Sequence, residues 1–363
     1  EVKSRDEVYS TDQMKFIHIA DVHLGACPDQ GKPWAGARER EIWDSFYRVL
    51  QTAKEQQVDF VLIAGDLFHR QPLKRELKEI SYQFEKINPV KVVVIAGNHD
   101  YIGAHSYYRD FQWPENVFFF RQQQMSCLYF ESESVYIYGL SYENYEITQP
   151  LYDQVRPSNR EGCHILLAHG GDEKHIPIQF NRLADAGFDY VALGHIHKPE
   201  ILRTDRMAYS GALEPIDKND TGSHGYISGT WQDGQMHIQF VPFAKRSYIH
   251  LPVRMDGNMP WSMVVDIVRE AIENNGTEHI YKVVLSGFSD PDLKFDIQAL
   301  TRLGNIAEVE NKTQPDYDLD LLYRQNKDNI IGMYIKKISS LQEDEAMKKK
   351  ALYMGLHALL NSR

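Results

Sequence analysis

The sequence predicts a layered α/β fold followed by a small α+β unit. Two observations lead to this prediction. Short aliphatic runs bounded by Gly or Asp recur over residues 14–245, and such runs are typical of buried strands. Helical segments separate them, which indicates stacked sheets and helices. Beyond this region the alternation ends, so a second, smaller unit is expected.

Five of the predicted strands lead into polar residues. Their aliphatic sequences are FIHIA, FVLIAG, VVVIAG, HILLA and YVALG, and a carboxylate, amide or imidazole lies at or just past the end of each. Ligands of α/β sheets bind at the carboxyl ends of strands. We therefore expect these polar residues to meet at one sheet edge.

Two helices are expected among these strands. Residues 73–87 follow Pro72, and proline is common at helix starts. Residues 38–57 have apolar side chains at the spacing of one helix face. These side chains are Ile42, Phe46, Val49, Leu50 and Ala53.

The sequence after HIHKPE has a different pattern. The stretches AYSGAL, GYISGTW, MHIQFVPF and RSYIHLPV are strand-like, and we expect them to form an antiparallel second sheet over the first. Further on, the sequence predicts a helix at 261–274, strands at YKVVLSGF and IIGMYIKKI, a helix in DPDLKFDIQALTRLG and a helix at 341–360. The expected domains are a disordered or added leader at 1–13, a main domain at 14–245, a cap at 246–335 and a helical segment at 336–363.

The polar residues at the strand ends have the donor chemistry of a metal site. In chain order they are Asp21, His23, Asp66, Asn98, His169, His195 and His197. Oxygen and imidazole donors without thiolate suit Mn, Fe or Zn in pairs. Because a carboxylate has two oxygens, Asp66 is expected to bridge the two cations. One Asp in such a place is more often a helix cap or turn residue, but five such strand ends in this order are not expected by chance.

This order and spacing resemble the calcineurin-like metallophosphoesterase superfamily. The resemblance rests on Asp21-Val22-His23, Gly65-Asp66, Gly97-Asn98-His99-Asp100, His169 and Gly194-His195-Ile196-His197. It implies a four-layer α/β/β/α metallophosphoesterase sandwich of two sheets, with a small α+β cap domain. It also implies two divalent metal ions, with Mn(II) expected and Fe or Zn as alternatives.

The resemblance implies a role for each residue. One metal is expected on Asp21, His23, Asp66 and His197, and the other on Asp66, Asn98, His169 and His195. His99 would hydrogen-bond the phosphate or protonate the leaving oxygen. Asp100 would orient His99 through a hydrogen bond. Two cations about 3.5–4 Å apart would activate water for in-line attack on phosphorus.

Finer motifs resemble the SbcD-like DNA repair exonucleases, and within them the YhaO-like branch, over about residues 14–230. The stretches are HIADVHLG, AGDLFHRQ, AGNHDY, YVALGHIHKPE and YSGALEPID. In related nucleases a histidine at the position of His69 handles the DNA phosphate; without the resemblance, a role at the helix start is as plausible. YSGALEPID departs from the usual pattern at Ser210 and Pro215, and we expect it to be structural with some DNA contact.

The branch implies DNA as substrate and an SMC-like ABC-type ATPase as partner. The helix around Met347, Ala351, Met354 and His357 is the expected binding element, and simple packing within its own domain is the alternative. Dimers through the first helices are common in these nucleases. Trp43 and Tyr47, expected to be exposed, mark residues 38–57 as the candidate dimer surface.

Composition leaves two enzyme classes open. The net charge of −11 excludes a globally basic DNA surface and favours a small-molecule or nucleotide phosphodiesterase or phosphatase. The cap favours a nuclease, and the complete ligand set argues against a scaffold with a vestigial site. Cys27, Cys127 and Cys163 are too few for a disulfide framework, which fits a cytoplasmic location. No run approaches the roughly 18 apolar residues of a membrane span, and no secretion signal is expected.

Overall fold

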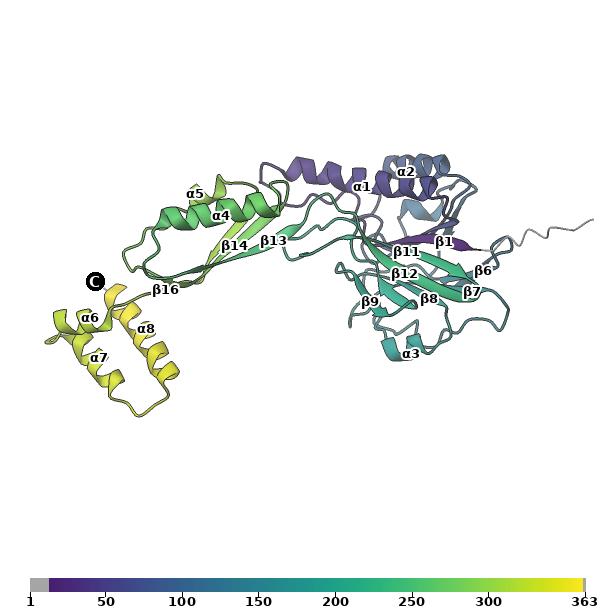
Figure 1. Cartoon of the computed structure of the whole chain (residues 1–363). Helices are drawn as coiled ribbons and strands as arrows, with labels where there is room; N and C mark the ends of the chain where they lie inside the picture. Colours follow the sequence, from purple (N-terminus) through teal and green to yellow (C-terminus); the bar gives the residue numbers. More distant parts are fainter. Residues whose placement is uncertain (1–12, 362–363) are drawn as a thin grey trace, which may run out of the picture. The chain divides into compact units, whose positions relative to one another are not determined.

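Two six-stranded sheets lie at the centre of the first of two units, which extends to Tyr248 (Figure 1). The computed structural model describes residues 13–361. The leader expected at 1–13 therefore lies, except for Gln13, outside the described residues. The second unit begins at Ile249.

The first sheet has the strand order β12-β11-β1-β2-β3-β4. Its strands are β1 (Met14–Ile19), β2 (Phe60–Ala64), β3 (Lys91–Ile95), β4 (Val117–Phe120), β11 (Gly225–Gln232) and β12 (Gln235–Pro242). Strands β1 to β4 run parallel, so the carboxyl ends of β1, β2 and β3 share one edge.

The second sheet has the order β5-β6-β7-β8-β10-β9. Its strands are β5 (Ser126–Phe130), β6 (Val135–Gly139), β7 (Cys163–His169), β8 (Tyr190–Gly194), β9 (Glu200–Arg203) and β10 (Met207–Tyr209). Strands β6, β7, β8 and β10 are parallel. The helices of this unit are α1 (Ala35–Glu55), α2 (Lys74–Lys86), the short η1 (Tyr107–Arg109) and α3 (Phe180–Ala184).

Alternation along the strands produces the layers. On β1, Ile17 and Ile19 face α1 and α2, whereas Phe16 faces the second sheet and packs in one cluster with residues such as Ile165. Leu183 of α3 belongs to a third cluster on the outer face of the second sheet. The order α/β/β/α expected from the sequence is confirmed (Figure 1).

The strands after residue 200 do not form the separate antiparallel sheet that we expected. Strands β11 and β12 form a hairpin that extends the first sheet, with β11 antiparallel to β1. Gly229 makes this close pairing achievable, because a Cβ at that position would lie 2.0 Å from the ring of Phe16. The AYSGAL stretch instead supplies β10 to the second sheet.

The second unit combines a small sheet with helices. Its sheet has the order β13-β14-β15, with β16 also paired to β14. The strands are β13 (Tyr248–Met255), β14 (Ile280–Ser289), β15 (Ile306–Asn311) and β16 (Gln314–Pro315). The helices are α4 (Trp261–Asn275), α5 (Ile297–Thr301), α6 (Leu319–Gln325), α7 (Ile330–Ser339) and α8 (Glu345–Asn361). Helix α4 packs on the sheet, and α6 to α8 share their own apolar cluster (Figure 1).

One strand prediction in this unit is wrong. The stretch IIGMYIKKI forms α7, because Ile331, Ile335 and Ile338 recur at helical spacing and pack in the same cluster. The side chain of Asn329 caps this helix by accepting from the N–H of Ile331 at 2.9 Å. β-branched residues favour strands only weakly, and tertiary packing overrides that preference.

The other predicted helices are present, but one is shorter than expected and two aromatic side chains of α1 are less exposed than expected. Helices α1, α2, α4 and α8 lie where the sequence predicted them, but α5 begins only after its cap Asp296. Trp43 and Tyr47 are half-buried against the core rather than exposed, with Trp43 also in ring contact with Phe68. Within residues 13–361 no helix is both long and apolar enough to cross a bilayer.

Candidate metal centre

Five strand ends bring the predicted donors together. Strands β1, β2 and β3 end just before Asp21, Asp66 and Asn98, whereas β7 ends on His169 and β8 ends just before His195. Because the two sheets pack face to face, the edge formed by the first three strands meets the edge formed by the other two. The seven predicted donors therefore converge from both sheets.

The backbone turns sharply where these donors lie. Asp21, His23, Asp66 and His195 have φ angles of 50°, 52°, 50° and 100°. Positive φ is uncommon outside glycine and tends to persist at functional sites, where the surrounding structure holds it.

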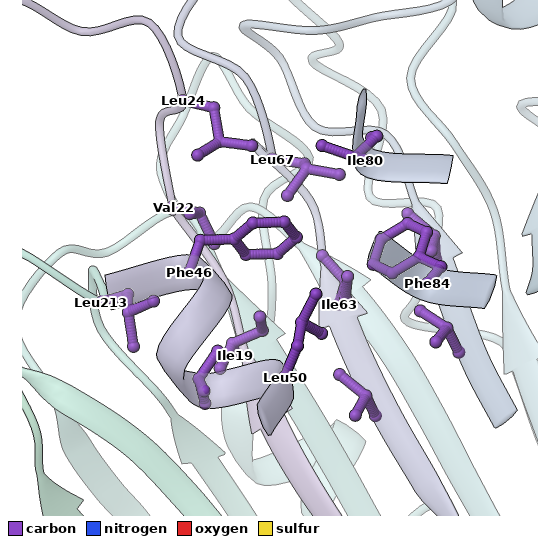
Figure 2. Packing of buried hydrophobic residues seen from close by; sticks show 14 of the residues in the cluster. Ile19, Val22, Leu24, Phe46, Leu50, Ile63, Leu67, Ile80, Phe84 and Leu213 are labelled. Carbon is purple, nitrogen blue, oxygen red and sulfur yellow. The ribbon is translucent and has the colours of Figure 1, made fainter. Parts of the chain in front are cut away.

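The same loops send alternate residues into the core. Val22, Leu24 and Leu67, which flank the donors, pack with Phe46 of α1 (Figure 2). This packing holds the loops on the core, while the intervening Asp and His side chains point to the site.

Three glycines allow the strand ends to approach closely. A Cβ on Gly65 would lie 2.4 Å from Nδ1 of His169, and one on Gly97 would lie 2.2 Å from Oδ1 of Asp66. A Cβ on Gly194 would lie 2.1 Å from the carbonyl oxygen of Ala64. The glycine that precedes Asp66, Asn98 and His195 is therefore required by space.

The first donor set contains Asp21, His23 and His197, whose ligand atoms lie within 4.8 Å of one another. Nε2 of His23 is 3.0 Å from Nε2 of His197 and 4.0 Å from Oδ2 of Asp66. The Asp21 carboxylate also accepts from the backbone N–H of His195, at 2.9 and 3.1 Å.

The second donor set contains Asp66, His169 and His195, again within 4.8 Å of one another. Nε2 of His169 lies 3.4 Å from Oδ2 of Asp66 and 2.9 Å from Oδ1 of Asn98. Nδ1 of His195 lies 3.1 Å from the same Asn98 oxygen. Asp66 thus lies between the two sets.

These separations fit a divalent cation in each set. Two donors that each lie about 2.1 Å from a cation are about 3 Å apart at a right angle and about 3.4 Å apart at the tetrahedral angle. The contacts between His23 and His197 and between Asp66 and His169 have these lengths. Oxygen and imidazole donors suit the metals that the sequence suggested.

Burial and mutual attraction shift the pKa values of the donors. Burial raises the pKa of Asp21 to about 6. Burial acts to raise the pKa of Asp66 too, but the imidazole of His169 holds it well below its usual range. Burial lowers and Asp66 raises the pKa of His169, with a net rise to about 9. Buried His23 has a strongly lowered pKa. Buried carboxylates and imidazoles of opposite charge thus lie side by side in this site.

Three imidazoles are oriented through the nitrogen that faces away from the donor set. His169 Nδ1 lies 2.9 Å from the Ala64 carbonyl, His197 Nδ1 lies 3.1 Å from Asp220, and His195 Nε2 lies 2.7 Å from Asp172. Such partners fix the ring and the tautomer of a metal ligand. Our sequence reasoning missed both carboxylates. Asp172 follows His169 by three positions, which is a usable signal, but Asp220 reaches His197 only through the fold.

The YSGALEPID stretch has a clear structural role. Glu214 is fully buried and accepts from Oγ of Ser45 at 2.6 Å and from Nη1 of Arg38 at 3.2 Å. Arg38 also donates to the carbonyl of Pro215 at 2.8 Å. These bonds tie α1 to the segment that leads to Asp220.

His69 and His99 lie next to the first donor set. Their rings stack with centroids 5.2 Å apart, and each also contacts the ring of His23. Nδ1 of His99 is 3.0 Å from the carbonyl oxygen of His69, and Nδ1 of His69 is 3.3 Å from Nδ1 of His23. Both rings are partly exposed, so both can meet a substrate.

Asp100 does not orient His99 as expected. Its buried carboxylate accepts from the N–H of Gly97 at 2.8 Å, the N–H of Phe68 at 3.2 Å and the hydroxyl of Tyr108 at 2.9 Å. Asp100 therefore joins the loops after β2 and β3, and the His99 ring is held by the His69 carbonyl instead. Burial raises the pKa of Asp100 to about 6.

Comparison with known proteins agrees with this geometry. A family model described as calcineurin-like phosphoesterase matches residues 14–199. An uncharacterized metallophosphoesterase, YhaO, of Bacillus subtilis (strain 168) is 31% identical over 247 residues, which cover 62% of this chain and 60% of the relative.

Two further similarities are more distant. The DNA double-strand break repair protein Mre11 of Methanocaldococcus jannaschii is 30% identical over 222 residues, 57% of this chain and 58% of the relative. The chain thus spans about 60% of the length of these relatives. A solved structure of GAP50, the anchor in the inner membrane complex of Plasmodium, has a TM-score of 0.39 at 13% identity over 64% of this chain and 85% of that one, too low to support an inference. From the family match, with which the converging donors agree, this chain belongs to the calcineurin-like phosphoesterase family.

Proposed function

We propose that this phosphoesterase cleaves phosphodiester bonds of DNA during DNA repair, with two Mn(II) ions in the donor sets. The observation that carries the proposal is the stacked pair His69 and His99 beside the first set. A phosphomonoester or small diester can be bound by cations alone, whereas a polymer needs side chains that hold its phosphate in register. The similarity to Mre11 over 222 residues supports the same substrate class.

The proposed ligands follow the two sets. One ion would be held by Asp21, His23, Asp66 and His197 and the other by Asp66, Asn98, His169 and His195, because these donors converge. When bound, such a pair supplies Lewis acidity and an activated water at the phosphate.

The remaining chemistry belongs to His69 and His99. Nδ1–H of His99 donates to the His69 carbonyl, so in the neutral ring Nε2 is free to accept a hydrogen bond and, once protonated, to deliver a proton to the leaving oxygen. His69 lies within hydrogen-bond reach of His23, and its remaining nitrogen would bind a phosphate oxygen. Asp100 holds the two loops that carry these rings.

A lysine on the small sheet of the second unit is already paired with carboxylates. Lys282 lies between Glu308 and Glu310, at 3.2 and 3.1 Å, so its charge is already compensated. In this proposal DNA binds to the first unit, which carries the donor sets, with help from partners.

We propose that an SMC-like ABC-type ATPase is such a partner and binds α8. Met347 and Met354 lie seven positions apart on this helix and are 60% and 67% exposed. Exposed apolar side chains on one helix face are typical of a protein interface. The proposal also includes a homodimer, which light scattering can test. It further includes a cytoplasmic location, which agrees with the three free cysteines.

Paired assays test the function. Labelled duplex DNA and bis-p-nitrophenyl phosphate are offered to the enzyme at one Mn(II) concentration and at low salt, because phosphate contacts weaken as salt rises. Cleavage of both substrates is expected. Hydrolysis of the small diester without cleavage of any DNA, alone or with the ATPase, would favour the small-molecule or nucleotide phosphodiesterase, which the net charge of −11 also supports.

His69→Ser refines this test. The variant should lose DNA cleavage much more than small-diester hydrolysis, with metal content unchanged, because a small ester does not need to be held. Equal losses on both substrates would make His69 a general support of the site.

A further inference from the structure

A surface pocket is lined in part by the loops that follow His69 and His99. It has a volume of about 420 Å³, and its lining includes Gln71 and Tyr101. Each of these residues lies two positions after one of the paired histidines, and Nε2 of Gln71 donates to the Tyr101 carbonyl at 2.9 Å. The loops that carry the two histidines therefore also form a wall of this pocket.

A third loop joins the pocket to the same histidines. Asn144 lines the pocket, and the ring of the next residue, Tyr145, lies 6.0 Å from that of His99 and 5.7 Å from that of His175. Tyr145 is 48% exposed. The loop that lines the pocket at Asn144 therefore also contacts His99 through Tyr145.

The lining includes two tyrosine rings. Tyr101 is partly buried and Tyr107 is 52% exposed. Gly103 lets the Tyr101 ring lie against the turn, because a Cβ there would lie 2.9 Å from that ring. Among the described residues that line the pocket there is no Lys or Arg; the lining also contains the imidazole of His105 and the carboxylate of Glu143.

This chemistry favours an uncharged ring over a second phosphate. A phosphate in the pocket would meet the carboxylate of Glu143 and no Lys or Arg. A base can instead stack on tyrosine, and a ribose can hydrogen-bond to Glu143 or Asn144. Sites for small organic groups have volumes of about 300–1,000 Å³. The volume of this pocket, about 420 Å³, lies in that range.

We infer that this pocket binds the nucleoside esterified to the phosphate that is held at the metal centre. The inference rests on the proposed function and deepens it: the substrate offers an unpaired nucleotide, since a base within a duplex cannot enter a pocket. Stacking of one base on an aromatic side chain contributes about 1–3 kcal/mol, and 1.4 kcal/mol corresponds to about tenfold in affinity.

Three probes separate the pocket from the metal centre. Inorganic phosphate, ribose 5-phosphate and adenosine 5′-monophosphate are titrated by calorimetry into Mn(II)-loaded full-length protein, and each is also measured as an inhibitor of bis-p-nitrophenyl phosphate hydrolysis. We expect the monophosphate nucleotide to bind about tenfold more tightly than ribose 5-phosphate. Equal affinities in the wild type would overturn the inference.

Two tyrosine variants locate the effect. Tyr107→Ala, at an exposed ring, should remove the advantage of the nucleotide, and Tyr107→Trp should retain it. Tyr82→Ala is the matched control, because Tyr82 is 58% exposed but lies outside this pocket, and it should retain the tenfold difference. A Tyr107→Ala variant that keeps the full difference would contradict the assignment. If the nucleotide advantage is present but no DNA is cut, the pocket stands and DNA as the substrate falls.

Discussion

A single methyl group at Gly97 should disable the site although every proposed ligand residue is retained. A Cβ at Gly97 would lie 2.2 Å from Oδ1 of Asp66 and 2.6 Å from its backbone nitrogen, whereas ordinary contacts begin at 3.4 Å. The φ of Gly97 is not in the left-handed region, so Ala is disfavoured by contact alone. Because one contact is with backbone, rotation of the Asp66 side chain cannot relieve it.

The magnitude follows from these distances. Asp66 and the loop of Gly97 must separate by about 1 Å, the difference between 2.2 and 3.4 Å. Misplacement by about 1 Å can reduce an enzyme rate about 100-fold, and overpacking destabilises by about 1–3 kcal/mol. The movement would also break the bond from the His99 N–H to Oδ1 of Asp66, now 2.8 Å. We therefore expect Gly97→Ala to lose about 100-fold in kcat and some metal affinity.

The assay measures bis-p-nitrophenyl phosphate hydrolysis, metal content by elemental analysis and the Tm of each variant. Gly36→Ala in α1 is the matched control, since a Cβ there meets nothing within 4 Å; Gly to Ala in a compatible position stabilises by about 0.4–1 kcal/mol. Full activity of Gly97→Ala with two bound metals would refute the close-packing argument for the whole centre.

Three further predictions concern the ligands and the proton donor. Asp66→Ala should lose both metals and activity on every substrate, because Asp66 lies between the two donor sets; two retained ions by elemental analysis would remove its bridging role. His99→Ala should keep both metals and lose about 10²–10⁴-fold in kcat, and loss of metal instead would make His99 a ligand. Metal affinity should rise from pH 6 to pH 9, because the cation displaces protons from Asp21, whose pKa burial raises to about 6, and from His169, whose pKa lies at about 9. Calorimetric Mn(II) titrations across this range check the sign, and an affinity that does not change with pH would contradict it.

Local sequence patterns were sufficient to predict the proposed metal donors and most of the helices and strands. Asp21, Asp66 and His195 follow aliphatic runs directly, and parallel strands present their carboxyl ends at one edge whatever lies between them. The glycine before Asp66 also indicates that strand ends meet here, since only a residue without a Cβ leaves room for the end of another strand. Helices α1 and α2 have an apolar face that the sequence displays at helical spacing.

Other features depend on contacts between distant segments. The hairpin β11–β12 completes the first sheet because β1 has a free edge, which no local pattern records. Isoleucines at 331 and 335 form a helix because that face packs with α8. Asp100 bonds to two loops rather than to its neighbour His99, since a buried carboxylate is satisfied by whichever N–H and O–H groups the fold brings near. Asp220 reaches His197 across 23 positions for the same reason. The sequence by itself thus determined the chemistry of the centre, because ligand identity is a property of side chains, and the tertiary structure decided which partners orient those ligands, because hydrogen bonds are chosen by proximity in space.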